Sequence, residues 1–196
     1  NYDITIREGT LIIEKKAFSE SMLSVSGSYI YNGADQTVSY VMADGNILSP
    51  GDYSVSGHIA ANAGTHTIVI TATDPGNYVG SITKTWIIQK KTLTVTGESG
   101  VREYNRSGHT LTGYTVEGLI DGHHVAHFTY TATGIHIAQY EGVFYGDILI
   151  HDVYEMDMGD NYDLIVIPGV LTIIPRDISS AEVTLGDLLV YNGMEQ

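Results

Sequence analysis

The sequence contains no cysteine. This absence excludes disulfide bonds, zinc sites built on cysteine, and thiol nucleophiles. It does not exclude secretion, because a domain with an adequate hydrophobic core folds without disulfides. Basic residues are also scarce, since 9 Lys and Arg stand against 23 Asp and Glu and give a formal net charge of −14. Nucleic-acid binders need a basic surface, so this balance argues against nucleic acid as a partner.

Two longer signals are missing as well. No run of about 18 or more apolar residues is present, so we expect no membrane span in this fragment. No signal peptide is present either, but the chain reads as a window on a longer array, which gives that absence little weight. Apolar positions do not recur at helical spacing, whereas Thr, Val, Ile and Tyr dominate the apolar runs, as in pleated strands. We therefore expect an all-β protein.

The strongest positive signal is internal repetition. Two short markers recur in phase about every 75 to 85 residues, which is the signature of a tandem array. That period is too long for a solenoid and suits tandem immunoglobulin-like β-sandwich modules. The Asn-Tyr marker stands at Asn1-Tyr2-Asp3, Asn77-Tyr78 and Asn161-Tyr162-Asp163, and the Tyr-Asn marker stands at Tyr31-Asn32-Gly33, Tyr104-Asn105 and Tyr191-Asn192-Gly193.

The markers set the expected domain boundaries. Residues 17–90 and 91–176 form two complete repeats, residues 1–16 match the last strand of a preceding repeat, and residues 177–196 match the opening of a third. Turn residues separate the expected strands. Gly97-Glu98-Ser99-Gly100 indicates a hairpin-like turn, and Ile167-Pro168-Gly169 a bulge or an edge position. Strands are expected at 21–27, 36–42, 52–57, 64–72 and 80–89, and at 92–97, 110–118, 123–132, 144–155 and 163–174.

Alternation along two strands predicts which side chains are buried. In the strand at 64–72, Ile68, Ile70 and Ala72 fall on one face. In the closing strand, Trp86 is the only tryptophan and falls on the face of Ile88. We expect a core position for Trp86, in preference to a sugar-stacking platform. The equivalent closing-strand positions are Leu11 and Leu171 for Trp86, and Ile13 and Ile173 for Ile88.

Several of these motifs resemble a known family. The segments YNGADQ (31–36), GNILSPGDYSVS (45–56), NAGT (62–65), GNY (76–78) and TKTWII (83–88) resemble the bacterial Ig-like surface-protein repeats of the MBG or YDG type. The second repeat resembles a related variant through LTGYTVEGLIDGHHV (111–125) and GDNYDLIVIPGVLTI (159–173), although it lacks the NAGT element. The resemblance implies β-sandwich modules, an extracellular, secreted or cell-wall-attached location, and no catalysis.

Histidines form the tightest group of potential ligands. On a regular strand, His123 and His127 share a face and His124 points the other way. The same-face pair would be roughly 13 Å apart, which is too far for one zinc ion. Only partners from another strand, such as His151 or His136, could complete a site. We expect a structural or solvated role for these histidines and no metal site.

The acidic run 152–163 offers other chemistry. Asp157 and Asp160 could hold calcium, but the run lacks regular D-x-D-x-D spacing, so a solvated loop is expected. Asp152 with Asp163, or Glu155 with Asp157, could be read as glycosidase pairs, yet only their separation would define that mechanism. The sequence has no G-x-S-x-G and no P-loop. The glycosylation sequon Asn105-Arg106-Ser107 is a chance match in a bacterial context. We expect no catalytic residue and no cofactor.

Tyrosines are the most abundant aromatic residues, with 14 in the chain. The marker tyrosines (Tyr2, Tyr31, Tyr78, Tyr104, Tyr162 and Tyr191) are expected to pack with a hydrogen-bonded hydroxyl, because they repeat at equivalent places. Tyrosines outside the markers are better candidates for a surface role. They are Tyr114, Tyr130, Tyr140 and Tyr145.

The expected function is mechanical and spatial: non-catalytic modules, partnered by neighbouring modules of the same chain, present a distal domain away from the cell. One alternative is an adhesin that binds a host protein or glycan, and another is an accessory module of a secreted polysaccharide-degrading enzyme. The two ends form a separate expectation. Because unpaired strands are unstable, residues 1–16 and 177–196 should pair with the chain's own modules or, by strand exchange, with a neighbouring molecule.

Overall fold

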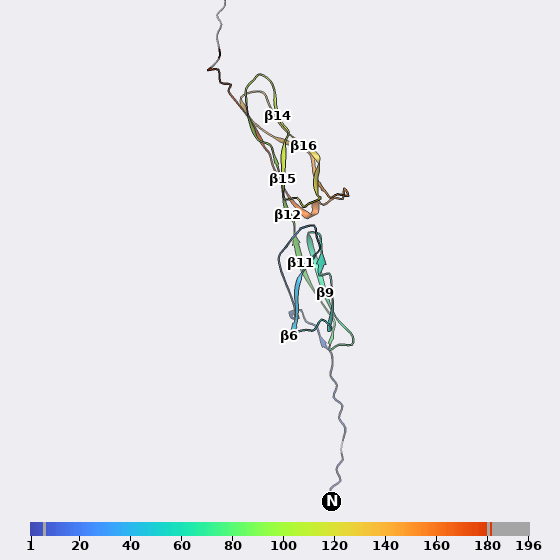
Figure 1. Ribbon diagram of the computed structural model, residues 1–196. Helices are drawn as coiled ribbons and strands as arrows, with labels where there is room; N and C mark the ends of the chain where they lie inside the picture. The colour runs from blue at the N-terminus through green and yellow to red at the C-terminus, as the bar shows by residue number, and fades with distance from the viewer. Residues whose placement is uncertain (6, 180, 182–196) are drawn as a thin grey trace, which may run out of the picture. The chain divides into compact units, whose positions relative to one another are not determined.

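The computed structural model describes residues 1–5, 7–179 and 181, and its described part is all-β. Before the second repeat it contains two long strands, β9 and β11, and shorter elements around them (Figure 1). The elements are β1 (Lys16–Ala17), the 3-10 turn η1 (Glu20–Met22), β2 (Leu23–Ser26), β3 (Tyr29–Ile30), β4 (Gln36–Thr37), β5 (Ser39–Asp44), β6 (Asn46–Ile47), β7 (Tyr53–Ser56), β8 (Ile59–Ala60), β9 (Gly64–Ala72), β10 (Tyr78–Val79) and β11 (Ser81–Gln89).

Strands continue after Lys90 with almost no break. The further elements are β12 (Lys91–Gly97), β13 (Gly100–Glu103), β14 (His109–Leu111), β15 (Tyr114–Glu117), β16 (His124–Gly134), β17 (Ala138–Glu141), β18 (Val143–His151), the 3-10 turn η2 (Gly159–Asn161), β19 (Tyr162–Ile167) and β20 (Val170–Ile174). The strand is interrupted at Pro168 and Gly169, as expected, but β19 and β20 belong to different sheets, so the interruption is not a bulge within one strand. Among the described residues, no helix is long and apolar enough to cross a membrane.

The strands form several sheets. The first part of the chain contains a four-stranded sheet in the order β3-β11-β9-β7, a three-stranded sheet β2-β5-β6, and the short pairs β1-β10 and β4-β8. The later part contains three-stranded sheets in the orders β15-β12-β19, β13-β20-β17 and β14-β16-β18. Several sheets around shared apolar cores are compatible with a β-sandwich.

The described chain divides into two compact units. Unit 1 contains Asn1–Val95, Val116–Phe128 and Asp147–Val166. Unit 2 contains Thr96–Thr115, Thr129–Gly146 and the described residues from Ile167 onward. Sequence repeats and compact units are defined by different properties, so the predicted repeat boundaries stay a prediction.

Unit 1 has a core built from both of its larger sheets. Ile68 and Ile70 on β9 are fully buried, as their alternation predicts, and they pack with Leu23 on β2 and Met42 on β5. Trp86 is also buried, and its indole Nε1 donates a hydrogen bond to the carbonyl of Gly57 at 3.0 Å. Full burial of one large aliphatic side chain contributes about 1.5–3 kcal/mol. The burial of Trp86 confirms its predicted core position.

Unit 2 has a smaller core of its own. Leu171 and Ile173 on β20 are buried and pack with Leu111, Tyr130 and Ala132. The predicted core positions in the second closing strand are thus confirmed. Tyr130 corrects a surface assignment, because it is 3% exposed and its hydroxyl donates to the carbonyl of Glu98 at 2.8 Å.

In both parts of the chain, one strand and the strand that follows it belong to different sheets. β2 pairs with β5, and β3 then joins β11 in parallel, with Tyr29 opposite Ile88. In the later part β12 lies beside β15 and β19, whereas β13 joins β20 in parallel, with Gly100 opposite Leu171. The hairpin-like turn predicted at 97–100 is therefore wrong. A hairpin would pair β12 with β13, but this turn carries the chain from one sheet to another.

The N-terminal segment does not pair with the chain's own modules over residues 1–5 and 7–15, so that part of the expectation is wrong. Residues 1–5 and 7–15 form no strand, and Tyr2, Ile4 and Leu11 are at least 85% exposed. Strand pairing begins at Lys16, which lies opposite Tyr78 in the short parallel pair β1-β10. Pairing of this end with another molecule stays a prediction. Most of the predicted segment 177–196, including the marker at Tyr191, lies outside the described residues.

Candidate functional site

The two sequence markers meet in unit 1. The ring of Tyr31, from a Tyr-Asn marker, lies edge to face against that of Tyr162, from an Asn-Tyr marker, with centroids 5.6 Å apart. The Tyr162 hydroxyl is 2.8 Å from His123 Nδ1, and the His123 ring centroid lies 6.2 Å from that of Tyr31. Both tyrosines are buried. Side chains from the two predicted repeats thus share one aromatic cluster, which we call the marker junction.

Asn161 adds a buried hydrogen bond to this junction. Its side-chain Oδ1 accepts a bond from the backbone N–H of Ala63 at 2.8 Å, and Asn161 is 5% exposed. The 3-10 turn η2 presents this side chain, because the Asn161 N–H bonds the Met158 carbonyl at 3.0 Å. Buried polar groups are costly when unpaired. Asn161 and Ala63 therefore depend on each other across the junction.

The glycine of the Tyr-Asn marker allows a close approach. Gly33 has φ +78°, and a Cβ there would lie 3.1 Å from Ile120 Cγ2. The preceding Asn32 fixes the turn, since its Oδ1 accepts from the Ala34 N–H at 3.0 Å. Glycine adopts this left-handed backbone without a side-chain penalty. The Tyr-Asn-Gly sequence thus supplies the ring, the turn and the space that the junction needs.

Burial changes the acid–base behaviour of the junction tyrosines. It raises the pKa of Tyr162 above its ordinary value, although a hydrogen bond from the Ile120 N–H opposes this. Burial also raises the pKa of Tyr31, and the nearby charge of Asp152 adds to the effect. Both phenols are therefore held in the neutral form, which can donate a hydrogen bond.

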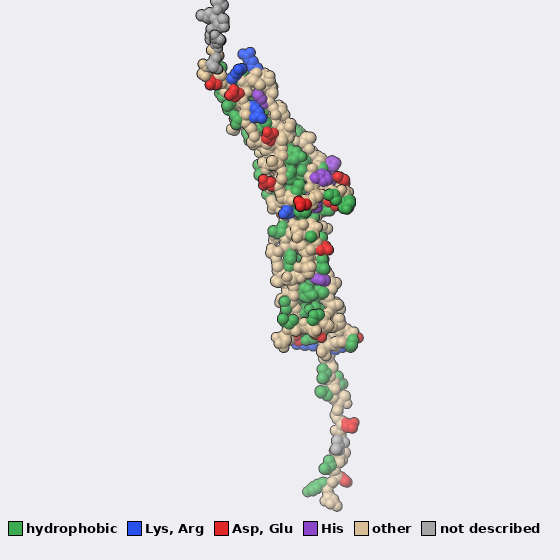
Figure 2. Space-filling view, in the orientation of Figure 1, with side chains coloured by type: hydrophobic (Ala, Val, Ile, Leu, Met, Phe, Trp, Pro, Cys, Tyr) green, Lys and Arg blue, Asp and Glu red, His purple; other side chains and the backbone are tan. Residues whose placement is uncertain are grey.

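A separate group of side chains in unit 1 has the chemistry of a metal site. One ligand atom from each of His124, His151 and Glu155 lies within 4.8 Å of the others. Glu155 Oε1 is 3.7 Å from His124 Nε2, and Glu155 Oε2 is 3.2 Å from His151 Nδ1. The ring of His127 also lies against His151, with centroids 5.5 Å apart. Histidine side chains gather beside carboxylates on one edge of the molecule (Figure 2).

This group overturns the predicted strand geometry. His124 and His127 were expected on opposite faces, yet both rings pack against His151. His127 has φ +65°, so strand alternation breaks at this residue and neighbouring side chains change direction. His123 lies instead in the marker junction. His151 is a partner from another strand, as the sequence suggests for this group, whereas Glu155 was not predicted as a ligand although it lies only four residues after His151. Its side chain reaches His124 and His151 only because the loop after β18 turns back.

A tight loop between β18 and η2 presents Glu155. Asp152 Oδ1 accepts hydrogen bonds from the N–H groups of Tyr154 and Met156 at 2.8 and 2.9 Å. The Met156 and Tyr154 bonds lower the pKa of Asp152, and the nearby His123 and His151 add to the shift. Glu155 itself has φ +60°, which non-glycine residues rarely adopt. These hydrogen bonds therefore fix the backbone of the loop on both sides of Glu155.

Other predicted ligands lie apart from this group. Asp157 Oδ1 accepts the Gly159 N–H at 2.8 Å, so it caps the turn before η2. His136 is exposed and is not one of the three grouped residues. Calcium binding by Asp157 and Asp160 stays a prediction.

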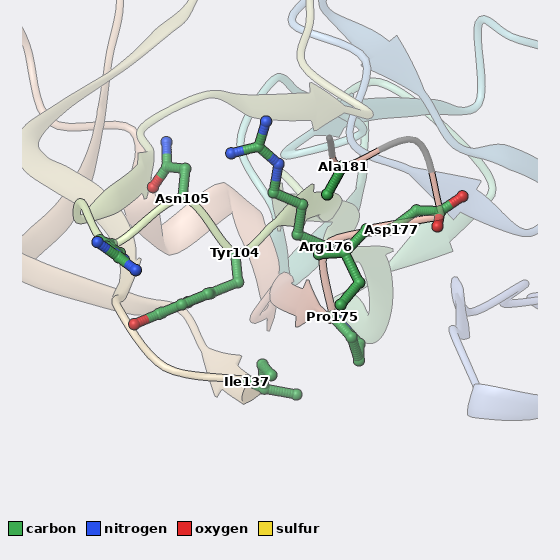
Figure 3. A pocket seen from close by; sticks show the side chains of 9 residues that line it. Tyr104, Asn105, Ile137, Pro175, Arg176, Asp177 and Ala181 are labelled. Carbon is green, nitrogen blue, oxygen red and sulfur yellow. The ribbon is translucent and has the colours of Figure 1, made fainter. Parts of the chain in front are cut away.

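The second Tyr-Asn marker lies in unit 2 beside a pocket. Tyr104 and Asn105 line it together with Ile137 and the segment that follows β20 (Figure 3). Asn105 Oδ1 accepts the Ser107 N–H at 2.8 Å, and Arg106 between them has φ +69°. The residues that complete the lining are Arg106, Pro175, Arg176, Asp177, Ile178 and Ala181.

Comparisons of the chain with protein-family models, with curated proteins and with solved structures found no match.

Proposed function

We propose that the chain is a stretch of non-catalytic β modules that act as a spacer in a bacterial cell-surface or secreted protein. In this role the modules present a more distal domain away from the cell. Their principal partners are neighbouring modules of the same kind. The resemblance of the repeated motifs to bacterial Ig-like surface repeats supports an extracellular location.

The marker junction is the observation that carries this proposal. A spacer must transmit force between successive repeats, and a flexible linker would extend before it did so. Here Tyr31 and Ala63 from the predicted first repeat contact Tyr162 and Asn161 from the second. Tyr31, Asn161 and Tyr162 belong to the repeated markers, so the contact between the two tyrosines can recur along an array, whereas Ala63 belongs to the NAGT element that the second repeat lacks.

The direct connection between the predicted repeats supports the same role. β11 ends at Gln89 and β12 begins at Lys91, so only Lys90 lies outside the two strands. A one-residue connection leaves little slack for extension, since an extended residue spans about 3.3–3.6 Å. Leu93, just after the connection, is fully buried in the core of unit 1.

Single-molecule pulling between handles at residues 17 and 176 tests the mechanical role. We expect the wild-type chain to resist extension until cooperative unfolding steps occur. Asn161→Ala should lower the force of an early step, because it leaves the Ala63 N–H unpaired. Asn105→Ala is the matched control, since Asn105 is exposed and its Oδ1 accepts the Ser107 N–H within its own turn. Gradual extension of the wild-type chain without cooperative steps would contradict the spacer role.

One surface feature favours the alternative role as an adhesin. The loop that holds Glu155 exposes Val153, Tyr154 and Met156, which are 66%, 82% and 62% exposed. Clustered exposed apolar side chains are typical of interaction sites. Binding to a host protein or glycan that Tyr154→Ser abolishes, with the fold unchanged, would favour this alternative over a pure spacer.

A further inference from the structure

We propose that His124, His151 and Glu155 bind a divalent transition-metal ion such as zinc. The site is distinct from the marker junction and does not depend on the spacer role. It uses side chains from β16, from β18 and from the following loop. Two imidazoles and one carboxylate form a donor set that suits zinc, nickel, cobalt or copper better than calcium or magnesium.

The distances between the ligand atoms fit a tetrahedral ion. Zinc bonds nitrogen and carboxylate oxygen at about 2.0–2.2 Å, which places tetrahedral ligands about 3.4 Å from one another. Glu155 Oε2 lies 3.2 Å from His151 Nδ1, and the other carboxylate oxygen, Oε1, lies 3.7 Å from His124 Nε2. One ligand atom from each of the three residues lies within 4.8 Å of the others, so the three side chains already lie near one another without an ion.

Backbone strain supplies a second and independent observation. Among the described residues, the non-glycine positions with positive φ are Arg106, His127 and Glu155. Two of these three, His127 and Glu155, direct their side chains at His151. Strained residues tend to cluster where function requires a fixed geometry. Two separate segments with strained backbone therefore place side chains at the proposed site.

The surroundings allow access and hold the central ligand. The His151 side chain is 12% exposed, whereas those of His124 and Glu155 are 45% and 70% exposed. The ion can therefore enter from solvent and meet an imidazole that packing has already oriented. Such an arrangement leaves a fourth position for water, or for His127 after a change of its rotamer. His127→Asn distinguishes these two, because only a ligand role weakens binding when the residue is lost.

Bound metal would fix the loop that leads into the marker junction. Glu155 belongs to the segment between Asp152 and η2, and Asn161 follows at the end of η2. A ligand that binds only the folded state stabilises it by mass action. Zinc is therefore expected to raise the melting temperature of unit 1 and to slow amide exchange in residues 152–158.

Calorimetric titration of the chain, prepared without a histidine tag and stripped with a chelator, tests the site. We expect one equivalent of zinc to bind, with a rise of several degrees in melting temperature that EDTA reverses. Cobalt substitution should give the intense visible absorption of tetrahedral coordination.

The variants separate this site from nonspecific binding. Glu155→Gln should weaken zinc affinity at least tenfold, and because its side chain is mostly exposed the fold should remain. His151→Asn should abolish binding. His136→Asn removes an exposed histidine outside the group and should bind as wild type does. Equal affinity of the Glu155→Gln and His136→Asn variants, or no zinc binding by the wild type, would overturn the proposal.

Discussion

Tyr162 is the residue in which repetition, burial and hydrogen bonding coincide. It belongs to a marker that recurs along the sequence, it is 3% exposed, and its hydroxyl contacts both His123 Nδ1 and the Ile120 N–H. Packing of the ring and hydrogen bonding of the hydroxyl contribute separately to the stability of the fold. They can therefore be tested by different substitutions.

We predict that Tyr162→Phe lowers the free energy of unfolding by about 1–2 kcal/mol, because His123 and the Ile120 N–H lose a partner while the ring still packs. Denaturant unfolding measures this change. Tyr145→Phe is the control, since Tyr145 is 56% exposed and should change stability little. Equal effects of the two substitutions would show that the buried hydroxyl has no special role.

The raised tyrosine pKa values predict loss of stability in alkali. Burial raises the pKa of Tyr162 and of Tyr31 above 10.0. A raised folded-state pKa contributes stability that is present below the unfolded value and is lost as pH rises through the folded value. The free energy of unfolding should therefore fall above about pH 10. Tyr162→Phe should show a shallower fall over the same range, and an unchanged slope would contradict the assignment.

At the scale of elements, the turns depend on where glycine has space. Gly57 follows β7 with φ +68°, and a Cβ there would lie 2.0 Å from the backbone carbonyl oxygen of Thr67. Gly45 connects β5 and β6 with φ +76°, and its Cβ would meet nothing within 4 Å. The two turns share one backbone conformation and differ in packing. Alanine substitutions at the two glycines therefore distinguish the free-energy cost of the left-handed backbone from the cost of a steric clash.

We predict that Gly45→Ala destabilises the protein by about 1 kcal/mol, which is the cost of the left-handed conformation alone. Gly57→Ala should cost about 3 kcal/mol or more, because β7 and β9 must also move apart. That movement would disturb the bond from Trp86 to the Gly57 carbonyl. Thermal unfolding, followed by Trp86 fluorescence, measures both, and similar losses would contradict the steric argument.

The loop between β18 and η2 depends on one carboxylate. Asp152 accepts two backbone N–H bonds, and these lower its pKa from the ordinary 3.8. Stability from such a group is present above the ordinary value and is lost as pH falls through the lower folded value. Asp152→Asn should therefore remove part of the acid dependence of amide exchange in residues 153–156 below about pH 4. An unchanged dependence would exclude Asp152 as its source.

At the scale of the whole molecule, the main feature is the excess of negative charge. The net charge of −14 opposes the compact state through self-repulsion, and salt screens this repulsion over a Debye length of about 10 Å at 0.1 M. We predict that the melting temperature rises between about 10 and 200 mM NaCl. Near the isoelectric point of about 4.7 the rise should shrink. A melting temperature that falls with salt at neutral pH would contradict this account.

Core positions show how far sequence reasoning extends. Alternation in 64–72 correctly placed Ile68 and Ile70 in the core. Alignment of the closing strands did so for Trp86 and Leu171 but was wrong for Leu11, which is 85% exposed. These predictions succeed because strand periodicity is a local property. Tyr130 was misplaced, since its burial depends on contacts with Glu98 and Phe144 that are distant in sequence.

The sequence by itself determined the all-β class, the positions of the long strands β9 and β11, the core positions of Trp86 and Leu171, and the strong negative charge. Each follows from composition or from a period of two residues. Only the tertiary structure brought Tyr31 to Tyr162, and only it joined His124 and His151 to Glu155. Positive φ at His127 and Glu155 redirects those side chains, and residues far apart in sequence meet only when strands pack. The physical reason is that contacts between strands depend on register and on local breaks in alternation, which the chain fixes only when it folds.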